Sequence, residues 1–148
     1  MNKRSSVPRP RSPANALVIP APKQLHDGLL RFSFKYLQVT HEKFNLDGMD
    51  RIESLRGYLT SFLERLRHLS AMKVSEFCRP RNHAIRAHTI KWGDTSEPDG
   101  FSHLSEQMQA CEPWQFSISA NEHGRVHGIL LDSVFYVIWF DPDHRLYE

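Results

Sequence analysis

The stretch that decides the fold runs from Trp114 to Tyr147 and reads WQFSISANEHGRVHGILLDSVFYVIWFDPDHRLY. Two polar breaks divide it into three largely apolar runs, the pattern of three strands that fold back on one another. Asp132-Ser133 has the length of a two-residue hairpin loop. The segment 121–124 predicts a four-residue turn, because its Asn and Gly tolerate positive φ. The stretch therefore predicts a three-stranded antiparallel meander.

These two turns also set the expected register of the meander. The expected pairs across the first turn are Leu131 with Val134, Ile129 with Tyr136, His127 with Ile138, and Arg125 with Phe140. Those across the second turn are Ala120 with Arg125, Ile118 with His127, Phe116 with Ile129, and Trp114 with Leu131. Residues that pair across antiparallel strands share a face of the sheet. Both faces of the last two strands are apolar, so we expect further chain to cover each side.

Upstream of the meander, the sequence predicts an α+β domain. Residues 29–39 alternate apolar and polar side chains, which favours a first strand. Residues 50–69 carry apolar side chains at three-four spacing and predict a long amphipathic helix, with Asp50 as its N-cap. A short helix over 74–78, a strand over 84–92 and a short helix over 101–111 complete the expected elements. The expected fold is an antiparallel sheet whose C-terminal meander packs on the long helix.

Composition limits the class of protein. The chain has 148 residues, 40% of them apolar and 24% charged, which suits one globular domain with a core of its own. No apolar run approaches the roughly 18 residues of a membrane helix, so no membrane partner is expected. Cys78 and Cys111 are isolated, so the sequence indicates neither a disulfide framework nor a zinc site, and a cytoplasmic location is expected.

The N-terminal segment 1–25 differs in composition from the remaining chain, 26–148. It holds five basic residues, no acidic residue and five prolines, which predicts a disordered tail ahead of a single domain. The tail carries five of the nineteen basic residues, leaving fourteen against all seventeen acidic residues in the domain. Two interpretations stay open: a loose attraction to phosphate or an acidic partner, and a solubilising leader.

Polar residues gather where the last strand ends beside the 121–124 turn. Cleavage of RNA through its own 2′-hydroxyl needs a general base, a general acid and a cation near the phosphorus, with no cofactor. In this interpretation Glu122 or His127 is the base and His144 is the acid, while Arg125 stabilises the developing charge. The expected substrate-positioning residues are His123 and Tyr147, together with the basic strip Arg81, Arg86 and His88.

Other interpretations of the same residues stay open. His123, His127, Asp141 and His144 include enough imidazole and carboxylate to hold a divalent metal for a hydrolase. In a non-catalytic interaction protein, His127 would be a core histidine with one hydrogen bond, and Arg125 would pair with Asp141. Asp141-Pro142-Asp143 would then be a chain reversal whose Asp side chains bond the local backbone.

Two resemblances accompany these residues. The blocks NEHGRVHG (121–128) and VFYVIWFDPDHRLY (134–147) resemble a family of small proteins from bacteria and their phages, a likeness that covers about 31–147 and implies common ancestry but no activity. The order of elements also resembles the RelE and YoeB messenger-RNA interferase toxins, with His123, Arg125, His127, His144 and Tyr147 in comparable places. The segment 79–112 has no counterpart in those toxins. This second resemblance implies an endoribonuclease whose partners are RNA, including ribosome-bound mRNA, and an antitoxin protein, in a toxin-antitoxin or phage-defence context.

Overall fold

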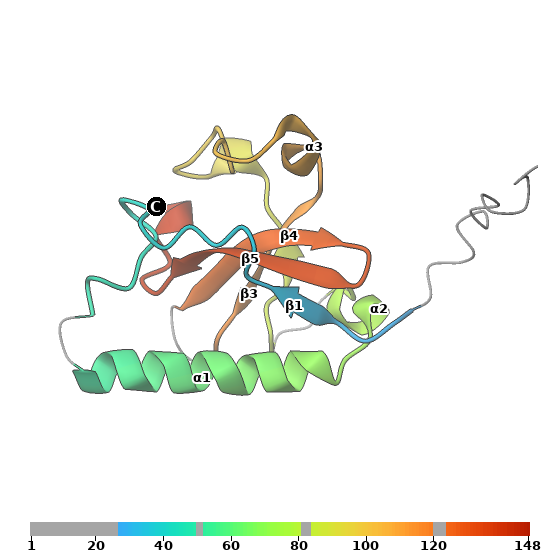
Figure 1. Ribbon diagram of the computed structural model, residues 1–148, viewed down its shortest axis with the longest axis horizontal. Coiled ribbons are helices and arrows are strands. Elements are labelled where there is room, and N and C mark those ends of the chain that lie inside the picture. Colours follow the sequence, from blue (N-terminus) through green and yellow to red (C-terminus); the bar gives the residue numbers. More distant parts are fainter. Residues whose placement is uncertain (1–26, 50–51, 81–83, 120–123) are drawn as a thin grey trace, which may run out of the picture.

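The computed structural model describes residues 27–49, 52–80, 84–119 and 124–148, so the predicted tail lies outside the described part. The domain is α+β, with a five-stranded sheet in the order β1-β5-β4-β3-β2 (Figure 1). Its strands are β1 (Arg31–Ser33), β2 (His88–Thr89), β3 (Pro113–Ser117), β4 (Arg125–Leu131) and β5 (Val134–Asp141). The helices are α1 (Ile52–Ser70), α2 (Val74–Phe77) and α3 (Glu106–Gln109), with single 3-10 turns η1 (Trp92–Asp94) and η2 (Arg145–Tyr147). β1 runs parallel to β5, and the other neighbouring strands are antiparallel.

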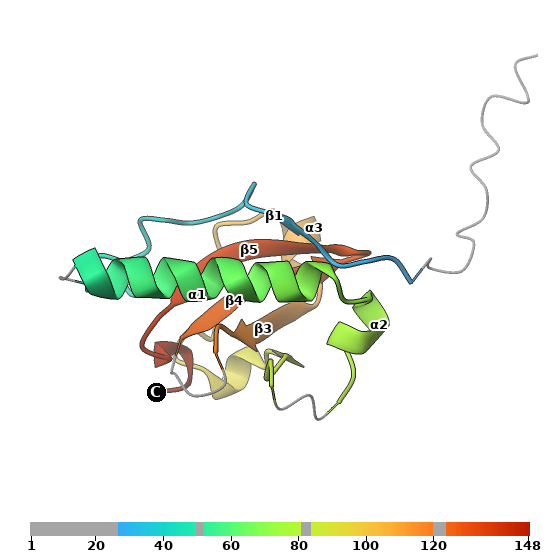
Figure 2. The ribbon, with the colours of Figure 1, turned by 90° about the horizontal axis from the view of Figure 1, so that it is seen from below.

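Helix α1 lies along one side of the sheet, and α3 and the C-terminus lie on the opposite side (Figures 1 and 2). The helix follows the prediction over 50–69 closely, although its expected cap Asp50 lies outside the described residues. Tyr58 and Phe62 are buried and meet the Phe140 ring edge-on. The three-four spacing of apolar residues also placed Leu59 and Leu63 on the buried stripe, and this prediction is wrong because they are 37% and 62% exposed. The buried stripe of α1 is therefore narrower than its apolar pattern, because the sheet covers only part of that face.

The turn between β4 and β5 confirms the predicted hairpin, and a bulge then changes its register. Leu131 pairs with Val134, and Asp132 adopts the left-handed region at φ 55°. The register shifts between His127 and Gly128, so that His127 pairs with Trp139 and Arg125 with Asp141. The expected pairing of Arg125 with Phe140 is therefore wrong by one residue.

Gly128 explains why the strands meet so closely at this bulge. A Cβ atom on Gly128 would overlap the carbonyl oxygen of Tyr136 on the neighbouring strand. Ile138, the extra residue of β5, accepts a hydrogen bond from the Gln38 N–H at 3.0 Å through its carbonyl oxygen. The indole N–H of Trp139 donates to Gln38 Oε1 at 2.7 Å. Gln38 thus stabilises the bulge through hydrogen bonds to both Ile138 and Trp139.

The register between β3 and β4 also differs from the prediction. Gln115, not Ile118, pairs with His127, and Ser117 pairs with Arg125. The expected tight turn is wrong because the connection is longer, with the Ile118 N–H donating to the Gly124 carbonyl at 3.1 Å. The shift of three positions is odd, so every β3 side chain changes face. Gln115 consequently lies on the face of His127.

Two of the expected strands are much shorter than predicted. Only Arg31–Ser33 of the segment 29–39 forms a strand, and only His88–Thr89 of the segment 84–92 does. The predicted helix over 101–111 is reduced to α3. Alternating side chains indicate which residues face the core, but an edge segment forms a strand only where a neighbour supplies hydrogen bonds.

Apolar clusters cover both faces of β4 and β5, as expected from their composition. The α1 side includes Phe116, Val126, Phe135 and Val137. The opposite cluster consists of Phe44, Ile90, Phe101, Ile129, Ile138, Trp139 and Leu146. Trp139 is its centre, since its ring lies 4.7 Å from those of both Phe44 and Phe101. Among the helices of the described segments, none combines the length and apolar character that a membrane span requires.

Candidate functional site

A pocket of about 280 Å³ opens where β2, β3 and β4 approach the C-terminal turn. We call it the basic pocket, and its lining residues are Arg86, His88, Gln115, Arg125, His144 and Tyr147. All of these except Gln115 are residues that the sequence nominated as catalytic or substrate-binding. The fold therefore brings five nominated residues, from segments far apart in the chain, to a single concave surface.

Two guanidinium groups give the pocket its charge. Arg125 begins β4 and is only 4% exposed, whereas Arg86 is exposed and has a left-handed backbone at φ 47°. Burial and the nearby charge of Arg86 lower the pKa of Arg125, while Asp141 acts in the opposite direction. An arginine stays protonated despite such a shift. The six lining residues include no carboxylate, so an anion is the ligand that this surface favours.

Asp141 is buried behind the pocket, where its oxygens are used within the protein. Oδ2 accepts hydrogen bonds from His127 Nε2 at 2.9 Å and from the Leu146 N–H at 3.1 Å. Oδ1 accepts the Arg145 N–H at 2.8 Å. Burial by itself would raise the pKa of this carboxyl, but these hydrogen bonds and the adjacent imidazole hold the pKa below its ordinary value. Asp141 is thus an ionised anchor for the C-terminal turn, and the predicted Asp-based chain reversal is confirmed for this residue.

The C-terminal turn places His144 and Tyr147 at the pocket. His144 precedes η2 in the left-handed conformation, at φ 54° and ψ 47°. The Tyr147 ring lies 5.9 Å from that of His144 and 6.1 Å from that of His88. Burial and the charge of Asp94 raise the pKa of Tyr147, so its phenol is neutral. Because Asp141 bonds the backbone of η2, it indirectly positions both rings.

His127 occupies a different environment from the one expected of a catalytic base. Its side chain is 0% exposed, packs edge-on against Phe44 at 5.8 Å and is not part of the pocket lining. Burial lowers its pKa, and the hydrogen bond to Asp141 only partly opposes this effect. The neutral ring donates from Nε2 and leaves Nδ1 without a hydrogen-bond partner in the described segments. His127 therefore fits the core-histidine alternative, and its contact with Asp141 gives it a positioning role.

His88 and Gln115 form one wall of the pocket and are neighbours across β2 and β3. His88 Nδ1 lies 2.9 Å from the Thr89 carbonyl oxygen, which only accepts, so this nitrogen carries a hydrogen. His88 Nε2 then accepts from Gln115 Nε2 at 2.8 Å. Both ring nitrogens are thus engaged. Gln115 was missed from the sequence because the expected register turned it toward the opposite face.

Glu122, His123 and Arg81 lie outside the described residues. The metal-binding alternative used His123, His127, Asp141 and His144. Within the described ranges, no group of three or more His, Cys, Asp or Glu side chains is arranged to hold a metal ion. The oxygens of Asp141 already accept three hydrogen bonds there.

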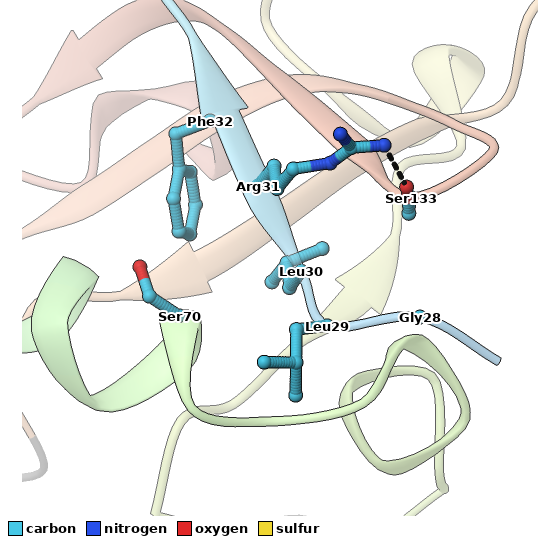
Figure 3. A pocket seen from close by; sticks show the side chains of 7 residues that line it. All are labelled: Gly28, Leu29, Leu30, Arg31, Phe32, Ser70 and Ser133. Atoms are coloured by element: carbon cyan, nitrogen blue, oxygen red, sulfur yellow. Dashed lines mark hydrogen bonds between the residues drawn. The ribbon is translucent and has the colours of Figure 1, made fainter.

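A larger pocket of about 810 Å³ lies beside β1, lined by Gly28, Leu29, Leu30, Arg31, Phe32, Ser70 and Ser133 (Figure 3). The Arg31 guanidinium donates to Ser133 Oγ at 2.9 Å (Figure 3). Its lining contains neither a histidine nor a carboxylate, so it offers no group for proton transfer near neutral pH. The basic pocket is the candidate functional site because five residues with suitable side chains converge on it from segments far apart in the chain. Comparisons with models of protein families, with curated proteins and with solved structures found no match.

Proposed function

We propose that the basic pocket binds a phosphate of RNA and that the protein cleaves the adjoining bond without a metal ion. The observation that carries this proposal is the convergence of Arg86, Arg125, His144 and Tyr147 on one small pocket without a lining carboxylate. Positive charge of this kind supplies affinity for the RNA backbone. The same charge stabilises a pentavalent phosphorus, which is more negative than the bound phosphodiester.

The proposed reaction needs one proton removed and one supplied. The 2′-hydroxyl loses its proton to a base and attacks phosphorus, the bond to the 5′-oxygen breaks, and an acid protonates that oxygen. We assign the acid role to His144 and the charge-stabilising role to Arg125, with Arg86 holding the phosphate at the rim. Glu122 is the proposed base because it lies three residues before Arg125 in the chain. His127 is no longer proposed for this role, because it is sealed in the core.

The finer proposal is an mRNA interferase of the RelE and YoeB type, with mRNA, including ribosome-bound mRNA, as substrate and an antitoxin as partner. Support comes from the order of elements, in which β1 precedes α1 and α2 and the chain ends after three antiparallel strands. Further support is the position of His144 and Tyr147 beside the pocket. Induced expression of the protein would then arrest bacterial growth, and a small neighbouring gene would encode the neutralising partner.

A second candidate function is phosphate recognition without catalysis, as in a binding module of phage or mobile-element origin. It is favoured by the state of two histidines: both nitrogens of His88 are engaged, and His127 is buried. His144 is then the one histidine to which a proton-transfer role is assigned. The two functions share the same pocket and ligand chemistry, and they differ in whether the RNA is cut.

RNA cleavage in EDTA distinguishes the two functions. We expect end-labelled RNA to be cut by the native protein, and the rate to fall by about 100-fold or more in His144→Ala, because a general acid contributes about that factor. Arg86→Ala should raise KM more than it lowers kcat. Arg86 is preferred to Arg125 for this test because Arg125 is almost fully buried and its removal would perturb folding.

Two exposed residues of α1 provide matched controls. His68→Ala and Arg67→Ala remove the same side-chain types away from the pocket and should cut RNA at the native rate. RNA binding without cutting by the native protein would favour the binding module. If the native protein neither binds nor cuts RNA, both functions are rejected.

A further inference from the structure

Four polar side chains form a row across four adjacent strands of the sheet. His88 on β2 is opposite Gln115 on β3, and Gln115 is opposite His127 on β4. His127 bonds Asp141 on β5 at 2.9 Å. Opposite residues of antiparallel strands lie on one face and within side-chain reach. We call this set the polar row, and it connects the wall of the basic pocket to the anchor of the C-terminal turn.

The polar row has a mismatch at its centre. Gln115 is 2% exposed, and its Oε1 has no hydrogen-bond partner among the described residues. On the opposite residue of β4, His127 Nδ1 is also buried and also has no hydrogen-bond partner among the described residues. With Gln115 Nε2 directed to His88, both of these atoms are acceptors. Buried acceptors without a donor destabilise the arrangement that contains them.

A single proton on His88 removes the mismatch. If the Gln115 amide turns by half a rotation, Oε1 takes the place of Nε2 beside His88 Nε2, and the N–H groups turn to the other side, where the neighbouring His127 has an acceptor in Nδ1. His88 Nε2 must then carry a hydrogen. Because His88 Nδ1 already donates to the Thr89 carbonyl, the ring becomes an imidazolium. Every link from Thr89 to Asp141 then has one donor and one acceptor.

We propose that His88 becomes the third cation of the basic pocket by taking up a proton when a phosphate binds, and that Gln115 is the positioning residue that couples this proton to His127 and Asp141. This inference rests on the proposed function for the identity of its ligand, an RNA phosphate. In this state His88 attracts the phosphate by its charge and not by a hydrogen bond, because both of its N–H groups donate within the protein.

The groups around His88 explain why uptake accompanies binding. Arg86 and Arg125 line the same pocket as His88, so a phosphate held by their charges lies beside the His88 ring. His144 and the neutral Tyr147 face it from the C-terminal turn, and His127 lies beyond Gln115 in the row. A bound phosphate supplies the opposing negative charge. Affinity for the phosphate must then rise as the pH falls, because binding and proton uptake are linked.

Titration calorimetry with a fully 2′-O-methylated RNA oligonucleotide tests the inference. This probe carries phosphates but lacks the attacking hydroxyl, so it binds without being cleaved. Titrations at one pH in two buffers of different ionisation enthalpy measure the protons taken up. We expect a clear uptake for the native protein and an affinity that rises by up to about tenfold for each unit of pH decrease.

Variants assign the proton to the polar row. His88→Gln should bind with no uptake, and Gln115→Met should bind with less uptake than the native protein. His68→Gln, on the exposed side of α1, should match the native protein. His88 is exposed on an edge strand, so its replacement leaves the core intact. A nitrogen-15 spectrum adds a readout that a purely structural role would not move: His127 Nδ1 should acquire the chemical shift of a hydrogen-bonded acceptor when the probe binds.

The outcomes separate this inference from the proposed function. Binding without proton uptake, or equal uptake in His88→Gln, would overturn the inference while RNA cleavage stood. RNA cleavage by a protein whose His127 spectrum is unchanged by the probe would also overturn it. Failure of the probe to bind at any pH between 6 and 8 would reject the pocket as an anion site, and with it both proposals.

Discussion

Asp141 anchors the candidate site from the core, although it does not line the pocket. It accepts three hydrogen bonds, one from His127 and two from the backbone of η2. Through the backbone bonds it sets the positions of His144 and Tyr147. Its carboxylate, which would otherwise offset the positive charge of the pocket lining, is turned inward and anchors the C-terminal turn.

Asp141→Asn should destabilise the protein by about 2 to 4 kcal/mol, because it removes a charged acceptor from buried donors. The free energy of unfolding from urea denaturation at pH 7.5 measures this effect. Asp143→Asn is the matched control, since Asp143 is exposed two residues away and should change stability by less than about 0.5 kcal/mol. If the two substitutions change the free energy of unfolding equally, Asp141 is not the anchor of the C-terminal turn.

The buried pair should also make stability depend on pH. Burial lowers the pKa of His127 in the folded state, so the unfolded chain binds this proton more readily. Its contribution is complete above about pH 6.5 and is lost as the pH falls below that value, with a slope of up to about 1.4 kcal/mol per pH unit. The pKa of Asp141 is also lowered, so its contribution is lost only in stronger acid, below about pH 4.

Urea denaturation at pH 7.5, 6.5 and 5.5 checks the histidine part of this dependence. The native protein should lose stability over this range, and His127→Gln, although less stable at pH 7.5, should show a flatter profile. His68→Gln should retain the native slope because that residue is exposed. A native slope in His127→Gln would show that another group titrates.

The β4 and β5 hairpin owes its site geometry to the bulge at Gly128. Without the bulge, Phe140 would face Arg125, as the sequence predicted, and Asp141 would turn away from His127. One extra residue in β5 reverses this arrangement and sends Phe140 to the α1 side, where it meets Tyr58 and Phe62. A local irregularity of one strand thus creates the contact between His127 and Asp141.

Gly128→Ala should destabilise the protein by about 2 to 4 kcal/mol, because its Cβ would overlap the backbone of Tyr136. Gly57→Ala on the exposed side of α1 is the control, since a Cβ there meets no atom within 4 Å. It should stabilise the protein by up to about 1 kcal/mol through helix propensity. Thermal unfolding of both variants measures the difference, and a tolerated alanine at 128 would contradict the assigned bulge geometry.

The distribution of charge over the whole chain separates the tail from the domain. Five basic residues lie in 1–25, whereas the remainder has fourteen basic and seventeen acidic residues. The domain therefore concentrates positive charge in its pocket while carrying a negative excess overall. Under the proposed function, the basic segment 1–25 would add an attraction to RNA that is independent of the pocket.

Deletion of residues 1–25 should weaken the salt dependence of RNA binding without abolishing cleavage. Each cation that contacts a phosphate of single-stranded RNA contributes about 0.7 to the slope of log affinity against log salt, so loss of five contacts would reduce the slope by about 3.5. The slope is measured by fluorescence anisotropy of labelled RNA over a salt range of about 50 to 200 mM. An unchanged slope would restrict the tail to a role in solubility.

Several features of the fold and site could be predicted from the sequence because they depend on local chemistry. The spacing of apolar residues identified α1, and Asp132-Ser133 identified the final hairpin. Arg86, His88, Arg125, His144 and Tyr147 were nominated as polar residues with suitable side chains, and the structure groups all five. Gln115 was missed because its face depends on the length of a connection that the turn residues did not reveal.

The sequence by itself determined the α+β class, the long helix, the final hairpin and the residue types available for chemistry, because each depends on neighbours in the chain. Only the tertiary structure decided which of those residues meet. The bulge at Gly128 turned Asp141 to His127, and the three-position shift of β3 turned Gln115 toward both histidines. Because side chains alternate along a strand, a register change of an odd number of residues exchanges the faces completely, and contacts between strands decide that register.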